Sequence, residues 1–189
     1  MKIILYSKSH FVRLKMLHRK WEHDITYEVG SLTNELRNEV DMESDFGRIL
    51  SNNLKNGIVE KEHQKRLWKQ VFNKSIEVDF LFLHIGFSGE RFETLIESAK
   101  ELEIEFKVVL NLFLSEERIE NKARIFAKNH RSFESIPEEE FVKKILTKEE
   151  LRISTLSGIK ILAKIVNINC DCPEVEIVEN ILEEIKVEN

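Results

Sequence analysis

Two apolar runs, residues 1–6 and 78–83, end in polar side chains that could do chemistry. Ser7 and Lys8 follow the first run, and His84 ends the second, which is the most hydrophobic stretch of the chain. The carboxyl ends of parallel strands form the edge where open α/β sheets bind ligands. His84 is therefore the leading functional candidate. The residues expected at this edge are Ser7, Lys8, His84, Ser88 and Asn111.

The sequence leaves three roles open for these side chains. Catalysis by His84 would need a partner within hydrogen-bond reach, and no catalytic histidine motif is visible. A structural histidine would bond a loop carbonyl instead, and a small anion site is the third possibility. Gly86-Phe-Ser-Gly89 lacks the lysine and the spacing of a phosphate loop, so we expect a turn there.

The two cysteines, Cys170 and Cys172, are separated by a single residue. They could supply two soft ligands to zinc, but a closed site needs four. This leaves a site shared between two chains, or two reduced loop cysteines. We expect no resident metal and no cofactor.

Composition favours a compact α/β protein. The 189 residues are 42% apolar and 33% charged, with only 2 Pro and 6 Gly, which argues against disorder and against a turn-rich β-sandwich. Apolar runs predict strands near residues 1–7, 25–29, 78–85 and 106–113, with a short polar edge strand at 131–136. Helical spacing predicts helices near 11–21, 46–54, 58–72, 92–102, 115–127 and 137–146.

This alternation predicts a five-stranded, doubly wound parallel sheet in residues 1–146, with a helical insertion at about 31–75. Residues 147–189 are expected to form a helical appendage. Thr147-Lys-Glu-Glu150 has the pattern of a capping box, which predicts a helix from about 148 to 166, and Pro173 opens a last helix. Both helices carry apolar stripes that need a partner. Those stripes either fold back onto the insertion or, as we favour, pair in a homodimer.

Three stretches resemble the receiver domain of bacterial two-component response regulators. Residues 2–17 are similar to its opening strand, acidic turn and first helix. Its third strand and the following loop are similar to Val78-Asp-Phe-Leu-Phe-Leu-His-Ile-Gly-Phe-Ser-Gly89. Ser135-Ile-Pro-Glu-Glu-Glu-Phe-Val142 resembles the run into its last helix. The resemblance implies a receiver-like, flavodoxin-like order of strands and helices.

The functional positions depart from the family pattern. Ser7 and Lys8 stand where receivers hold Mg²⁺ with two carboxylates, and His84 stands where they carry the phosphoryl-accepting aspartate. Asn111 replaces the hydroxyl residue of the fourth strand, and Glu134 falls near the lysine of the fifth. The resemblance therefore implies a pseudo-receiver that has lost the groups for phosphoryl transfer.

These observations predict a signalling or regulatory protein that binds other proteins without phosphorylation, with dimerisation through the C-terminal helices. The alternative is a nucleotide-binding sensor or a hydrolase or nuclease that uses the sheet edge around His84, so an enzyme is not excluded, although we favour a non-enzyme. The net charge of −5 and the acidic last helix predict only weak, salt-sensitive binding to nucleic acid. The sequence shows no leader and no membrane span, so we expect a cytoplasmic protein.

Overall fold

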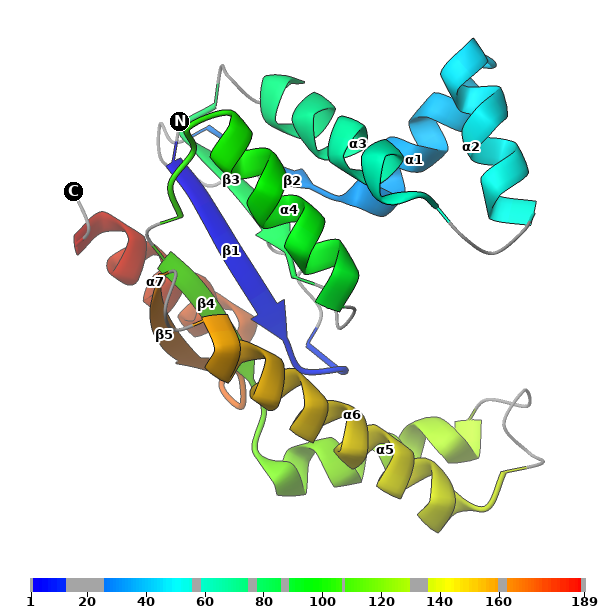
Figure 1. Cartoon of the computed structure of the whole chain (residues 1–189). Coiled ribbons are helices and arrows are strands. Elements are labelled where there is room, and N and C mark those ends of the chain that lie inside the picture. The colour runs from blue at the N-terminus through cyan, green and yellow to red at the C-terminus, as the bar shows by residue number, and fades with distance from the viewer. Residues whose placement is uncertain are drawn as a thin grey trace. The chain divides into compact units, whose positions relative to one another are not determined.

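The computed structural model describes residues 2–12, 26–55, 59–74, 78–85, 89–106, 108–129, 136–159 and 163–187 (Figure 1). The strands of this part of the chain are β1 (Lys2–Lys8), β2 (Tyr27–Gly30), β3 (Phe80–His84), β4 (Val108–Phe113) and β5 (Lys164–Asn169). The helices are α1 (Leu32–Asp41), α2 (Asp45–Lys55), α3 (Lys61–Lys74), α4 (Gly89–Glu101), α5 (Glu116–Asn129), α6 (Glu138–Ile159) and α7 (Glu174–Val187).

The strands form one five-stranded parallel sheet in the order β2-β3-β1-β4-β5, which confirms the α/β class. The flavodoxin-like order that receivers share places the first strand between the second and the third. Here β3 lies between β2 and β1, so the order differs at this one place.

The strands predicted near residues 78–85 and 106–113 are confirmed, and both are buried. Leu81, Phe82 and Leu83 of β3 are 0% exposed, and Val108, Val109 and Leu110 of β4 are at most 1% exposed. Continuous apolar runs are typical of parallel strands that are covered on both faces.

The chain divides into two compact units. The first contains residues 1–5 and 21–107, and the second contains residues 6–20 and 108–189. In the first unit, residues 32–74 hold three helices, α1, α2 and α3, where the sequence predicted two. The sequence analysis missed α1 because its buried face mixes Leu32 and Leu36 with two acidic residues, Glu35 and Glu39.

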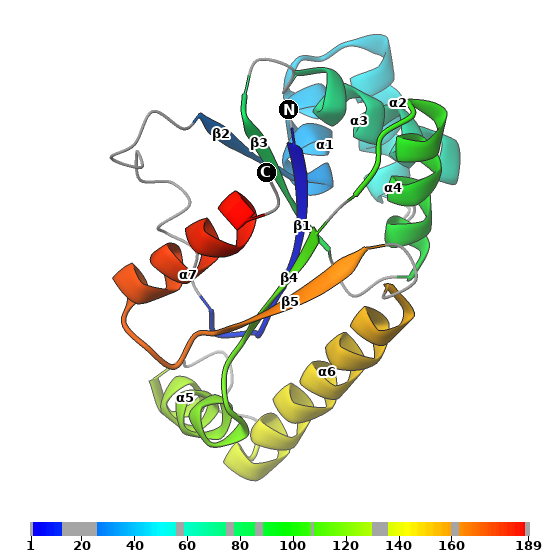
Figure 2. The same ribbon diagram turned by 90° about the vertical axis from the view of Figure 1, so that its left-hand side faces the viewer.

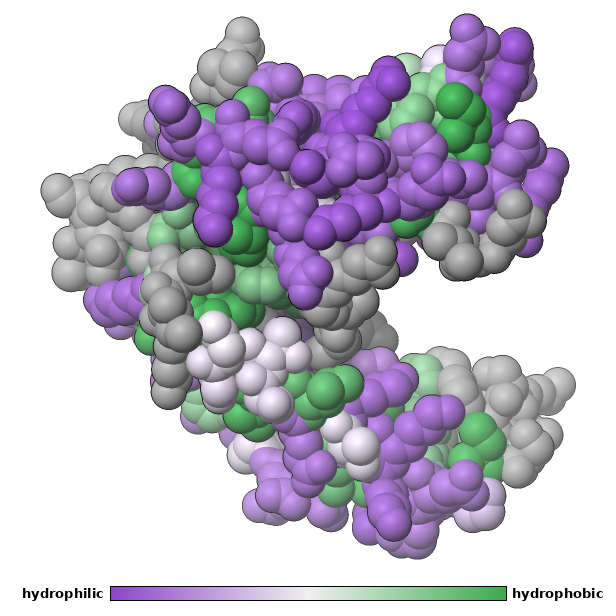
Figure 3. Space-filling view, in the orientation of Figure 1, coloured by the Kyte–Doolittle hydropathy of each residue, from purple (hydrophilic) through white to green (hydrophobic). Residues whose placement is uncertain are grey.

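The helices of the first unit are joined by polar contacts as well as by packing. Glu35 pairs with Lys74 of α3, and Glu39 accepts a hydrogen bond from Gln70 Nε2 at 2.9 Å. The outer side of α3 and α4 is hydrophilic (Figure 3), and ion pairs join the two helices there. These include Lys61–Glu97 at 2.7 Å and Lys65–Glu101 at 2.7 Å. Exposed pairs of this kind stabilise a fold only weakly.

In the second unit, α6 and α7 lie on opposite faces of the β4–β5 pair (Figure 2). The six residues of β5 pair in register with β4, from Val108↔Lys164 to Phe113↔Asn169. Val166 and Ile168 are buried, whereas Asn167 and Asn169 are exposed. This alternation is typical of a strand whose two faces are covered unequally.

The structure corrects the prediction for the C-terminal residues. The helix expected over 148–166 ends at Ile159, and residues 164–169 form β5, so the segment after 147 is not purely helical. The expected capping box Thr147-Lys-Glu-Glu150 lies inside α6, which runs through residues 146 and 147 without a break. Ile165 also fits the apolar stripe of the helix expected over 148–166, but from Lys164 onward the side chains alternate with the period of two that is typical of a strand.

The apolar stripe of α7 is covered within the chain. Ile177, Ile181, Leu182 and Ile185 are all at most 9% exposed, whereas Val175 is 66% exposed. The expected dimer was predicted because this stripe needs an apolar partner. The chain itself covers most of the stripe.

Two predicted elements lie mainly outside the described residues: the helix at 11–21 and the edge strand at 131–136. In the part of the chain that the structure describes, no helix combines the length and apolar character needed to cross a membrane.

The first prediction concerns Gly47, where α2 passes the backbone of α1. A Cβ at Gly47 would lie 2.1 Å from the Glu39 carbonyl oxygen, a backbone atom that cannot turn away. Gly47→Ala should therefore lower the free energy of unfolding by about 1–3 kcal/mol in urea denaturation. Gly158→Ala in α6 is the matched control, because its Cβ would meet no atom within 4 Å. This variant should gain about 0.5–1 kcal/mol, and equal effects at the two positions would contradict the close approach.

Candidate functional site

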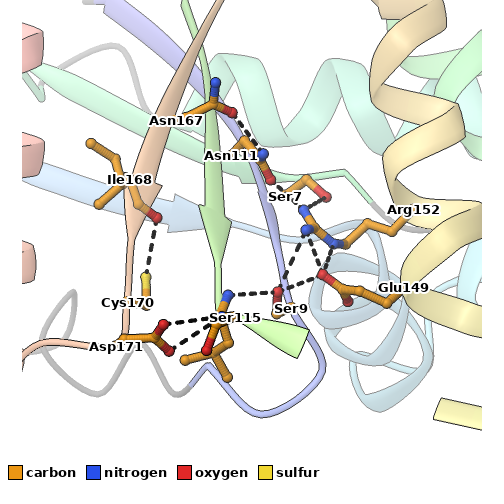
Figure 4. Close-up of polar contacts among 11 residues, drawn as sticks. Ser7, Ser9, Asn111, Ser115, Glu149, Arg152, Asn167, Ile168, Cys170 and Asp171 are labelled. Carbon is orange, nitrogen blue, oxygen red and sulfur yellow. Dashed lines mark hydrogen bonds and ion pairs between the residues drawn. The ribbon is translucent and has the colours of Figure 1, made fainter. Parts of the chain in front are cut away.

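A polar cluster lies at the carboxyl ends of β1 and β4, and the Arg152 side chain of α6 is at its centre (Figure 4). Arg152 is 1% exposed and Glu149, one helical turn before it, is 8% exposed. The guanidinium Nε and Nη2 donate to Glu149 Oε1 at 2.8 and 2.5 Å. A buried cation is tolerated only when it is paired and hydrogen-bonded in this way.

The remaining donors of Arg152 bind the strand ends. Its Nη1 donates to Asn111 Oδ1 of β4 at 2.5 Å and lies 3.4 Å from Ser7 Oγ of β1. Asn111 Nδ2 then donates to Asn167 Oδ1 at 2.8 Å, which extends the network to β5. Arg152 therefore links α6 to the ends of three strands, β1 and β4 directly and β5 through Asn111.

Ser9 connects the end of β1 to the end of β4. Its hydroxyl donates to Glu149 Oε1 at 2.5 Å and accepts the Leu114 amide at 3.1 Å. Its own amide donates to the Leu112 carbonyl at 2.8 Å. Ser9 is 0% exposed, so a substrate cannot reach its hydroxyl although a carboxylate lies beside it. The arrangement supports a structural role for this cluster.

The structure brings two of the predicted site residues together. Ser7 and Asn111 meet around Arg152. Lys8 belongs to the same unit, but its ammonium donates to the Val12 carbonyl at 2.8 Å, and burial lowers its pKa. Ser88 and Glu134 lie outside the described residues.

His84 ends β3 in the first unit, at the strand end where the sequence placed it. It is half-buried and lines a cavity of about 70 Å³. The cavity is otherwise lined by Ser31, Leu32, Thr33, Trp68, Ile85, Arg91, Phe92 and Leu95.

The two cysteines lie in the β5–α7 loop of the second unit. Asp171 lies between them, and its carboxylate accepts a hydrogen bond from the Ser115 amide at 3.1 Å. This bond connects the loop to the residue just before α5. Both Cys170 and Cys172 line a cleft of about 530 Å³, together with Phe11, Arg118, Lys122 and Phe126 among others. Among the described residues, no group of three or more His, Cys, Asp or Glu side chains is placed to hold a metal ion.

Sequence reasoning missed Ser9, Glu149, Arg152 and Asn167. The sequence does contain a signal for Glu149 and Arg152, because the buried positions of α6 recur at helical spacing. Glu149 and Arg152 fall in the buried stripe between Ile145 on one side and Leu156 and Ile159 on the other. Charged residues inside an apolar stripe indicate a buried ion pair.

Neither a protein-family model nor a curated protein matches this sequence.

The second prediction tests the ion pair. Arg152→Met leaves the Glu149 carboxylate buried without its cation, so the free energy of unfolding should fall by about 3–5 kcal/mol. The double variant Glu149→Leu with Arg152→Met removes both charges and should recover most of this loss. Urea denaturation at neutral pH measures all three proteins. A single variant as stable as the parent would show that the pair is not needed.

The third prediction concerns the cysteines. Burial raises the pKa of the Cys170 thiol to about 12, so at about pH 8 only about one molecule in ten thousand carries the reactive thiolate. Cys172 is half-exposed. Iodoacetamide should therefore modify the native protein once, at Cys172, and twice after denaturation. Mass spectrometry of the digested protein locates the label, and rapid labelling of Cys170 in the native protein would contradict the burial.

Proposed function

We propose that this protein binds an extended, basic segment of a partner protein along β5, and that this binding does not depend on phosphoryl transfer. The observation that carries the proposal is the free edge of the sheet. Among the described residues, β5 is the last strand of the sheet, and β4 pairs with only one of its two edges. In Figure 2, where β5 faces the viewer, no helix crosses in front of it.

The free edge offers backbone groups to a partner. The Cys170 amide donates to the Phe113 carbonyl at 2.7 Å, so it faces β4. Because amides alternate in direction along a strand, those of Ile165 and Asn167 face the free edge. An added strand would hydrogen-bond these groups, a common mode of peptide recognition. Natural proteins protect edges that serve no purpose.

A hollow beside β5 could receive the partner's side chains. It has a volume of about 420 Å³ and lies between the β4–β5 face and α6. Phe113, Ile119 and Ile153 give it apolar walls, and Ile153 is 53% exposed. Hydrophobic surface is visible over α6 in Figure 3. An added strand directs alternate side chains to this face, so every second residue of the partner should be apolar.

The charges near β5 favour a basic partner. Glu116 and Glu150 are exposed at the hollow, whereas its one cation, Arg152, is already paired with Glu149. The helix on the other face of β5 adds more negative charge, because α7 exposes Glu174, Glu176, Glu179 and Glu183. A lysine-rich or arginine-rich segment would be attracted to this edge, and a second copy of this acidic edge would be repelled.

The polar cluster around Arg152 supports a function that does not use phosphoryl transfer. In the pseudo-receiver interpretation, the ends of the first and fourth strands would carry the chemistry. At these ends, Arg152 already binds Ser7 and Asn111, and Lys8 binds a backbone carbonyl. The different strand order limits the resemblance to the general α/β class.

The alternative of a nucleotide sensor or nucleotide-using enzyme around His84 is less well supported. The cavity at His84 has a volume of about 70 Å³. Sites for molecules the size of a nucleotide measure about 300–1,000 Å³.

The fourth prediction tests the edge with synthetic peptides. A fluorescent peptide that alternates valine and lysine should bind at least roughly tenfold more tightly than a valine–glutamate peptide of the same length, with an affinity that falls with salt. Fluorescence anisotropy measures both. Ile165→Pro removes an edge-facing amide without removing a bond to β4, so it should abolish binding, whereas the control Ile165→Val should not.

Amide hydrogen exchange tests the same edge in the unaltered protein, without the proline variant. The basic peptide should slow exchange of the Ile165 and Asn167 amides in the unaltered protein. Equal affinity for the two peptides, or unchanged exchange, would overturn the proposal. So would sedimentation as a dimer with these amides already protected, because a second copy would then occupy the edge.

A further inference from the structure

The polar side chains that line the cavity at His84 can all donate hydrogen bonds. The cavity lies in the first unit, where β3 ends and where α1 and α4 begin. Its polar lining consists of Ser31, Thr33, Trp68, His84 and Arg91, and none of the described residues that line it is acidic. Carboxyl ends of strands and amino ends of helices meet at ligand sites in open α/β sheets.

The first turn of α1 supplies free backbone amides. Helices leave their first N–H groups without internal partners, and their amino ends attract anions. Ser31 is the N-cap residue, but its hydroxyl makes no capping hydrogen bond. The acidic residue of this turn, Glu35, is already paired with Lys74 of α3. Leu32 and Thr33 line the cavity, and in the described part of the chain the amides of both residues have no hydrogen-bond partner.

A buried donor that lacks an acceptor gives independent evidence for a ligand. Trp68 is 3% exposed and lines the cavity, and in the described part of the chain its indole Nε1 has no hydrogen-bond partner. A buried donor left in this state costs about 1–3 kcal/mol. An acceptor bound in the cavity would remove that cost.

The cavity also has an uncommitted positive charge. Arg91 of α4 forms no ion pair with any described residue, whereas Lys61, Lys65 and Lys69 on neighbouring α3 are all paired with glutamates of α4. A guanidinium matches the geometry of an oxyanion and can bind two of its oxygens. The His84 imidazole lies at the same cavity, and an imidazole N–H is a hydrogen-bond donor.

The size of the cavity limits the ligand to a small group. About 70 Å³ is enough for several water molecules or one tetrahedral oxyanion. We propose that this cavity binds a phosphoryl or phosphate group, held by Arg91, His84, the Trp68 indole N–H and the first amides of α1. No bond is made or broken, and the site is separate from the β5 edge, which belongs to the other unit.

Calorimetric titration with inorganic phosphate, against sodium chloride of matched ionic strength, tests the site. Phosphate should bind saturably and chloride should not. Arg91→Gln should weaken phosphate binding by roughly tenfold or more, and Arg91→Lys should restore part of it. The matched control is Arg48→Gln in α2 of the same unit, where the arginine side chain is 73% exposed and does not line the cavity.

NMR of the indole N–H groups gives a readout that a purely structural arginine would not change. The Trp68 indole resonance, assigned with Trp68→Phe, should shift on addition of phosphate in the parent protein and much less in Arg91→Gln. Phenyl phosphate then distinguishes the sources: equal binding assigns the site to the phosphoryl group of a larger molecule, and weaker binding assigns it to the free ion. Absence of saturable binding of both, or a Trp68 resonance that phosphate leaves unmoved, would overturn the proposal.

Discussion

The second unit depends on keeping one buried cation paired. The Arg152 guanidinium is almost fully removed from water, and the groups around it are arranged to satisfy its donors. Glu149 supplies the opposite charge from the same helix, and Ser7 and Asn111 supply oxygens from two strands. Since an unpaired buried charge costs several kcal/mol, the ends of β1 and β4 and the face of α6 must form together or not at all.

This constraint explains why we propose ligand sites at other places in the fold. The end of the sheet at β1 and β4 is where such folds commonly bind ligands, and here protein groups occupy that position. Uncommitted groups remain at two other places. The β5 edge offers backbone amides beside acidic side chains, whereas the cavity at His84 offers donors beside a positive charge. The two surfaces belong to different units and favour ligands of opposite charge.

The sequence was most informative where one short-range pattern determines structure. β1, β3 and β4 could be predicted because uninterrupted apolar runs have few alternatives, and the strand ends placed Ser7 and Asn111 at one edge. β5 could not, because Ile165 fits both a helical stripe and a period-two strand, and pairing with β4 decides between them. Arg152 was missed as a site residue because its place in the apolar stripe of α6 indicates burial but does not say which strands it binds. Its tertiary contacts with Ser9 and Asn111 supply that information.

The contact between Ser9 and Glu149 joins residues that are 140 positions apart, and the contact between Ser7 and Arg152 spans 145. Contacts of such separation pay a large loop-closure entropy and slow folding. During synthesis at about 5–20 residues per second, the end of β1 leaves the ribosome roughly ten seconds before Arg152 is made. Residues 21–107 of the first unit are complete long before that moment. The polar end of β1 must therefore wait for its partners until α6 has been made, and the second unit can close only after that.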